Sequence, residues 1–107
     1  MPPKEIYNVV KLVPKPGKFN EIASAFDTLS KWIQENEPKT QTYFALQPEG
    51  AEEFVLVEKY TDAQNLKEHA STAAFKTFFK AIGGLLAEKP EIKRSSYVAG
   101  FEGRAKL

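Results

Sequence analysis

The sequence contains no cysteine among its 107 residues. Disulfide scaffolds, zinc–thiolate sites, iron–sulfur clusters and cysteine nucleophiles are therefore excluded, because each requires a thiol or thiolate. Histidine occurs once, as His69, which excludes a metal or haem held by two imidazoles. A phosphate-cradling glycine loop and a dinucleotide fingerprint are also missing. We therefore expect no metal and no cofactor.

Charge of one sign and long apolar runs are missing as well. Lys and Arg total 15 and Asp and Glu total 14, giving a formal net charge of +1, whereas nucleic-acid binders need a basic surplus on one face. No apolar run reaches the roughly 18 residues of a membrane helix. The first residues lack the apolar stretch, about 7–15 residues long, of a signal peptide. We expect a cytoplasmic protein that binds neither nucleic acid nor membranes.

The composition is typical of one globular domain. Hydrophobic residues make up 42% and charged residues 27% of the chain, both ordinary values for such domains, and the length suits a single core. We predict one domain over residues 1–107, with a core at about 5–99 and a C-terminal tail at 100–107.

Apolar periodicity predicts the elements. Runs of β-branched and apolar residues predict strands at 6–13, 40–47, 54–60 and 91–100. Apolar residues spaced by three or four predict a helix over 18–36. A second helical region follows Thr61, a candidate N-cap, and continues after Thr72, a second candidate, through an apolar stripe that runs to Leu86 before Pro90.

The order β-α-β-β-α-β is typical of an α+β ferredoxin-like fold, in which two helices cover one face of a four-stranded antiparallel sheet. Strand 54–60 is apolar on both faces, because Val55 and Val57 oppose Phe54 and Leu56. Large exposed apolar patches are rare on soluble monomers, so the uncovered face needs a partner. We expect a homodimer through this sheet face, with twofold symmetry.

Three segments carry a resemblance to a known family: IYNVVKLVPKPGK, FVLVEKYTD and LKEHASTAAFKTFFKAI. They resemble the antibiotic biosynthesis monooxygenase family, dimeric α/β barrels that include quinol monooxygenases and anthrone-type oxygenases. The resemblance covers about residues 5–99. Glu58 and Tyr60 match a glutamate and a following aromatic residue at the end of the third strand. At the start of the last helix the family often has a histidine, a serine and a second histidine before a phenylalanine. His69 and Phe75 match the first and the last of these.

The sequence also departs from family patterns. Thr72 stands at a position where serine is common, and Ala74 replaces a second histidine. Asn8 matches an asparagine of the haem-degrading branch, but His69 and Phe79 stand where that branch has a tryptophan and a histidine. Since the axial haem ligand is missing, the resemblance does not imply haem degradation.

The resemblance implies a cofactor-independent monooxygenase that oxidises a small lipophilic or phenolic substrate, such as a quinol or an anthrone, with O2. The enzyme would deprotonate an electron-rich phenol or enol, and the carbanion would react with O2. Three catalytic residues are predicted: His69 as general base, Asn8 as the amide that stabilises an oxyanion, and Glu58 to orient His69 or the substrate. Structural alternatives are a packed imidazole, a buried amide bonded to the backbone, and an ion pair of Glu58 with His69, Lys80 or Arg94.

An apolar pocket between helices and sheet would hold the substrate ring. We predict Trp32, Phe44, Tyr60, Phe75 and Phe79 as its substrate-binding residues, although aromatic stripes at helical spacing are usually core. Two other functions stay open: a non-catalytic ligand-binding or stress-associated dimeric barrel, and an isomerase or decarboxylase with His69 as proton carrier. A quinol, an anthrone and a lipophilic carboxylic acid would all fit such a pocket.

Overall fold

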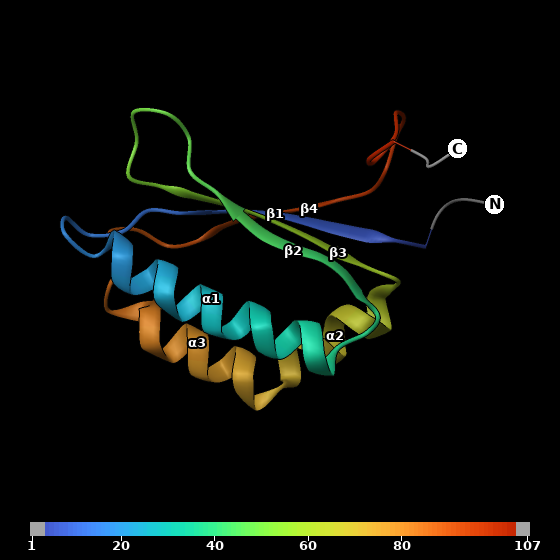
Figure 1. The fold of residues 1–107 in the computed structure, drawn as a ribbon, viewed down its shortest axis with the longest axis horizontal. Helices are drawn as coiled ribbons and strands as arrows, with labels where there is room; N and C mark the ends of the chain where they lie inside the picture. Colours follow the sequence, from blue (N-terminus) through green and yellow to red (C-terminus); the bar gives the residue numbers. More distant parts are fainter. Residues whose placement is uncertain (1–3, 105–107) are drawn as a thin grey trace.

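The computed structural model describes residues 4–104, which form a four-stranded antiparallel sheet with three helices on one face (Figure 1). The strands are β1 (Ile6–Leu12), β2 (Thr40–Leu46), β3 (Phe54–Tyr60) and β4 (Glu91–Ser95). The helices are α1 (Phe19–Asn36), α2 (Ala63–Ser71) and α3 (Ala73–Gly83). The strand order is β2-β3-β1-β4, and all neighbours are antiparallel. The predicted ferredoxin-like α+β fold is confirmed.

Helix α1 follows the predicted apolar stripe and ends two residues before Pro38. Its buried side chains, Ile22, Phe26, Leu29 and Ile33, recur at helical spacing and face the sheet. The backbone N–H of Glu37, the C-cap residue, donates to the Ile33 carbonyl. Glu37 therefore sits where α1 turns into β2.

The second helical region consists of two helices, separated at Thr72. The backbone of Thr72 is extended (φ −70°, ψ 150°), and its hydroxyl accepts a hydrogen bond from the Phe75 N–H at 3.2 Å, which confirms it as an N-cap. The N-cap of α2 is Asp62, whose side chain accepts from the Asn65 N–H at 2.8 Å. The prediction of Thr61 for this role is wrong, because Asp62 provides the acceptor one residue later.

Helix α3 is shorter than the apolar stripe indicates. It ends at Gly83, since two consecutive glycines lower helix propensity. Leu85 and Leu86 lie beyond it, and Leu86 forms an isolated β-bridge with Pro14. The last two apolar residues of the stripe therefore pack near the end of β1 and are not part of the helix.

The main core lies between the helices and the inner face of the sheet. Along β3, the residues at even positions are buried and those at odd positions are half-buried, the alternation of a strand that packs on one face. Ten buried side chains form the core: Val10, Leu12, Ile22, Phe26, Leu29, Ile33, Phe54, Leu56, Phe78 and Ile82.

The outer face of the sheet is also apolar in its centre. Val9 on β1 and Phe44 on β2 are 37% and 44% exposed there. β4 is shorter than the predicted 91–100, because β1 begins at Ile6 and its last pair with β4 is Tyr7 with Ser95. Beyond that pair only Ile6 of β1 remains. Within residues 4–104, no helix is both long and apolar enough to cross a membrane.

Candidate functional site

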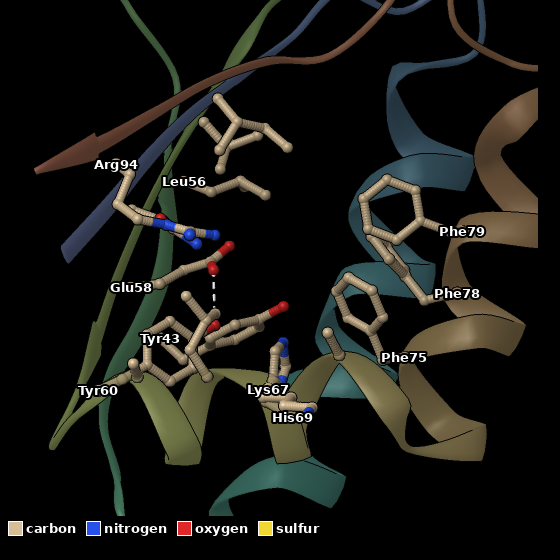
Figure 2. A pocket seen from close by; sticks show the side chains of 16 residues that line it. Tyr43, Leu56, Glu58, Tyr60, Lys67, His69, Phe75, Phe78, Phe79 and Arg94 are labelled. Carbon is tan, nitrogen blue, oxygen red and sulfur yellow. Dashed lines mark hydrogen bonds between the residues drawn. The ribbon is translucent and has the colours of Figure 1, made fainter. Parts of the chain in front are cut away.

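A cavity of about 340 Å³ lies between the inner face of the sheet and the helices α2 and α3 (Figure 2). Sixteen residues line it: Asn8, Val10, Tyr43, Leu56, Glu58, Tyr60, Ala63, Leu66, Lys67, His69, Ala70, Phe75, Phe78, Phe79, Ile92 and Arg94. It has an aromatic wall on one side and a polar row on the other (Figure 2). Such a combination is typical of sites for small organic ligands.

The aromatic wall comes from α3. Phe75, Phe78 and Phe79 lie on one side of the cavity (Figure 2). Their rings contact one another, with centroids 4.8 Å apart for Phe75 and Phe79 and 5.6 Å for Phe78 and Phe79. Aromatic groups prefer such tilted or edge-on contacts. The wall therefore suits a flat, apolar ring.

The polar row runs across the four strands of the sheet. Glu58 on β3 is paired in register with Tyr43 on β2 and with Asn8 on β1, and Asn8 is paired with Arg94 on β4. Because paired residues of an antiparallel sheet share one face, all four side chains line the cavity. The topology thus assembles one polar row from four distant parts of the chain.

Glu58 is the buried carboxyl of this row. The Tyr60 hydroxyl donates to its Oε1 at 2.6 Å. Burial raises the pKa of Glu58 above its ordinary value, while hydrogen bonds from Tyr60 and Asn8 oppose that rise. Burial, together with the nearby Glu58 charge, also raises the pKa of Tyr43 and of Tyr60. Both phenols therefore stay protonated near neutral pH.

His69 lies in the last turn of α2 and is only 2% exposed. Its Nδ1 is 2.9 Å from Oε1 and 3.2 Å from Oε2 of Glu37. The rings of Phe75, Tyr60 and Tyr43 surround it, with centroids 4.7, 5.3 and 5.4 Å away. Burial lowers the pKa of His69, and the Glu37 carboxylate opposes this effect. The imidazole is therefore neutral near pH 7.

Two buried polar atoms of this site lack a hydrogen-bond partner within residues 4–104: Asn8 Oδ1 and His69 Nε2. Burying a polar atom without a partner costs about 1–3 kcal/mol, so such atoms are rare in folded proteins. Both residues line the same cavity. A ligand that supplies hydrogen bonds to these two atoms would remove that cost.

Six of the eight predicted site residues meet at this cavity. They are Asn8, Glu58, Tyr60, His69, Phe75 and Phe79. Phe44 lies outside it, because β2 turns this side chain to the outer face, opposite Val57. Trp32 also lies outside, since it stands beside the buried stripe of α1 and is 37% exposed. The structure therefore does not bring Phe44 and Trp32 together with the other six at this cavity.

The predicted partners of Glu58 are also different. Its hydrogen bond comes from Tyr60, and the carboxylate that pairs with His69 is Glu37. Sequence reasoning missed Glu37 as a site residue, because 32 residues separate it from His69. Tyr43 and Arg94 could have been found from strand alternation, which places both side chains on the inner face once the register is known. Across residues 4–104, no group of three or more His, Cys, Asp and Glu side chains is arranged to hold a metal ion.

The sequence profile of one known family matches residues 5–81, and this family is antibiotic biosynthesis monooxygenase. The chain belongs to the antibiotic biosynthesis monooxygenase family. The matched segment includes Asn8, Glu37, Glu58 and His69 and ends before Arg94. No protein of curated function matches the sequence significantly.

Solved structures of the antibiotic biosynthesis monooxygenase type share the fold. A candidate antibiotic biosynthesis monooxygenase from Caulobacter crescentus is 28% identical, with a TM-score of 0.85 over 90% of this chain and 92% of that one. A candidate of the same description from Nitrosomonas europaea is 19% identical, with a TM-score of 0.85 over 92% and 94%. A conserved protein from Methanosarcina mazei is 24% identical, with a TM-score of 0.81 over 88% and 93%. The last two show the fold alone.

Proposed function

We propose that this chain is a monooxygenase that oxidises a small lipophilic or phenolic substrate, a quinol, an anthrone or a similar compound, with O2 and without metal or flavin. Membership of the antibiotic biosynthesis monooxygenase family supports the reaction class. The observation that carries the proposal is the unpaired, buried Nε2 of His69 at a cavity with an aromatic wall. The neutral imidazole of His69 thus provides a base beside a site for a flat ring.

In the proposed reaction, His69 Nε2 removes a proton from a hydroxyl or an activated carbon of the substrate. The resulting anion, whose charge is shared between the oxygen and a carbon atom, donates electrons to O2 from that carbon. One oxygen atom enters the product and the other leaves as water, and the substrate supplies the four electrons. The aromatic wall of Phe75, Phe78 and Phe79 holds the ring and keeps bulk water from the anion.

Asn8 is proposed to hold the substrate oxygen that carries the developing negative charge. In the structure Asn8 lies beside Glu58, its partner in register on β3, and Oδ1 is the unpaired atom of its amide. Rotation about the terminal torsion, which is soft for an amide, turns the NH2 group toward the substrate. Once His69 has removed the substrate proton, the rotated amide donates a hydrogen bond to the oxyanion.

The test is oxygen uptake by metal-stripped protein with a panel of hydroquinones and anthrones. We expect uptake, incorporation of one 18O atom per product from 18O2, and a loss of turnover of at least about 100-fold in each of His69→Ala and Asn8→Ala. Lys80→Ala is the control, since Lys80 is exposed on α3 and does not line the cavity. Equal rates in His69→Ala and the native protein would contradict the proposal.

Two outcomes would replace the proposal by its alternatives. A product with the mass of the substrate and no oxygen uptake would indicate an isomerase, and loss of CO2 a decarboxylase. No turnover, together with a lipophilic molecule retained through purification, would indicate a ligand-binding barrel.

We also propose that two copies associate through the outer face of the sheet. This face exposes Val9, Phe44 and Leu46, which form an apolar patch with half-buried Val55 and Val57. At one end of the face, Glu102 of the C-terminal tail accepts a hydrogen bond from Tyr7 and pairs with Lys59 at 2.7 Å. The cytoplasmic location stays a prediction.

A further inference from the structure

We propose that Glu37 is a positioning residue, which holds the proton of neutral His69 on Nδ1 and thereby keeps Nε2 as a free acceptor at the cavity. The tautomer itself follows from contacts within the chain. Its catalytic consequence rests on the proposed function, in which His69 is the general base.

The contact between the two side chains is close and buried. Both carboxylate oxygens of Glu37 lie within 3.2 Å of Nδ1, and the two side chains are 9% and 1% exposed. An ionised carboxylate only accepts hydrogen bonds, so Nδ1 must be the donor. A neutral imidazole carries one N–H, which leaves Nε2 with its lone pair. Nε2 is the atom that lacks a partner in the described part of the chain.

The Glu37 side chain is itself held in place. Its Oε1 accepts a second hydrogen bond from the Thr40 hydroxyl at 2.9 Å, and the Thr40 N–H donates to the Glu37 carbonyl at 3.0 Å. The Thr40 hydroxyl in turn accepts from the Asn65 amide at 3.4 Å, and Asn65 belongs to the same helix as His69. These contacts join the end of α1, the start of β2 and helix α2. The carboxylate therefore has little freedom to leave Nδ1.

Other elements present different groups to His69. The titratable or charged side chains that share its cavity are Tyr43 from β2, Glu58 and Tyr60 from β3, Lys67 from α2 and Arg94 from β4. Helix α3 presents the apolar ring of Phe75. Among the described residues, Glu37 alone forms a hydrogen bond with the imidazole. Glu37 is therefore the residue that determines the tautomer of His69.

Glu37 also affects how strongly His69 attracts a proton. When Nε2 takes up a proton, the imidazolium forms beside the carboxylate, which stabilises its charge. Burial lowers the pKa of His69, whereas Glu37 raises it. Removal of the Glu37 charge leaves the burial effect unopposed, so the pKa of His69 falls further. A weaker base would then abstract the substrate proton more slowly.

The decisive experiment is a two-bond 1H–15N correlation spectrum of the imidazole, recorded over a pH titration without substrate. The chain has one histidine, so one set of signals reports on His69. In the native protein we expect the Nδ1–H form to exceed the Nε2–H form by at least about tenfold. In Glu37→Ala this preference is lost, and in Glu37→Gln the titration of His69 moves to lower pH. A native protein that carries its proton on Nε2 would overturn the inference.

Glu35→Gln is the matched control, because it removes the same charge from an exposed position two residues away on α1. We expect the tautomer and the titration of His69 to be unchanged in it. Equal shifts in Glu35→Gln and Glu37→Gln would contradict a specific role for Glu37. If Glu37→Ala does not fold, as judged by far-UV circular dichroism, the native protein and Glu37→Gln still decide the question.

Kinetics then connect the inference to the proposed function. With an oxidised substrate identified, Glu37→Gln is expected to lower kcat by at least about tenfold, with KM nearly unchanged, and to move the acidic limb of the pH–rate profile to lower pH. A merely structural role would not move that limb. If the spectra agree with the inference but no compound of the panel supports oxygen uptake, the proposed function fails. The role of Glu37 in fixing the His69 tautomer then still stands.

Discussion

At the scale of single residues, the site combines two titratable groups whose surroundings push them toward the neutral form. Burial lowers the pKa of His69 and raises the pKa of Glu58. The pair therefore offers an imidazole able to accept a proton and a carboxyl group that resists ionisation. Shifted pKa values of groups that line one cavity are typical of functional sites.

The raised pKa of Glu58 predicts how stability depends on pH. A carboxyl group with a raised folded-state pKa stabilises the fold fully below its unfolded pKa, and this stability is lost as pH rises through the folded value. Glu58→Gln keeps an acceptor for Tyr60 and removes the ionisation. We expect the variant to have a higher free energy of unfolding than the native protein at pH 8 and no such advantage at pH 4, as measured by urea denaturation.

Glu52→Gln is the control for this prediction, because Glu52 is exposed in the loop between β2 and β3. Its free energy of unfolding is expected to follow that of the native protein at both pH values. A stabilisation by Glu58→Gln that is the same at pH 4 and pH 8 would contradict ionisation as its cause.

At the scale of elements, the junction of α2 and α3 brings the base and the aromatic wall together. Thr72 ends one helix and caps the next, and its hydroxyl also donates to the His69 carbonyl at 2.9 Å. The His69 and Phe75 rings meet across this junction, with centroids 4.7 Å apart. A continuous helix would carry the two residues on different turns of one axis. The cap is therefore part of the site's geometry.

Loss of this cap has a predictable cost. Thr72→Ala removes the acceptor for the Phe75 N–H and is expected to lower the free energy of unfolding by about 1 kcal/mol. Thr72→Ser keeps the hydroxyl and should recover most of that loss, whereas Thr77→Ala, at an exposed position within α3, should change little. Chemical denaturation monitored by circular dichroism measures all three. Equal losses in the alanine and serine variants at position 72 would refute the capping role.

Local patterns predict elements well where the determinant is local. The bounds of β3 and the end of α1 agree with the sequence prediction, because alternation and helical spacing act over a few residues. On β2, a register irregularity between Thr40 and Thr42 lies close to Tyr43 and Phe44. After it the pairing is regular, with Tyr43 opposite Glu58 on the inner face and Phe44 opposite Val57 on the outer face. This register depends on the pairing of β2 with β3, so the sequence alone does not tell which face of the sheet carries Phe44.

At the scale of the whole molecule, the sheet has one face covered by helices and one face uncovered (Figure 1). Val9 on the uncovered face and Trp32 on α1 are equally exposed, at 37%, but they lie on opposite sides of the molecule's sheet. This pair allows a matched test of the proposed homodimer. A charge introduced at a symmetric interface faces its own copy and an apolar surface, and both effects oppose association.

We expect Val9→Glu to raise the dissociation constant of the dimer by at least about 100-fold, and Trp32→Glu to leave it unchanged. Sedimentation equilibrium over a range of concentrations measures both. A native protein that sediments as a monomer throughout would refute the dimer. Weakening by Trp32→Glu alone would place the interface on the helical side instead, and equal weakening by the two substitutions would contradict a specific role of the outer face.

The sequence alone determined the element order, the ferredoxin-like class, the two-sided apolar sheet and the resemblance to the antibiotic biosynthesis monooxygenase family. These features depend on periodicity and on motifs that neighbouring residues encode. The tertiary structure decided what depends on contacts between distant segments. It aligned Tyr43, Glu58, Asn8 and Arg94 in one row, because strand register is a property of paired strands. It also placed Glu37 against His69, since α1 must end beside α2 before a carboxylate can select the tautomer of that imidazole.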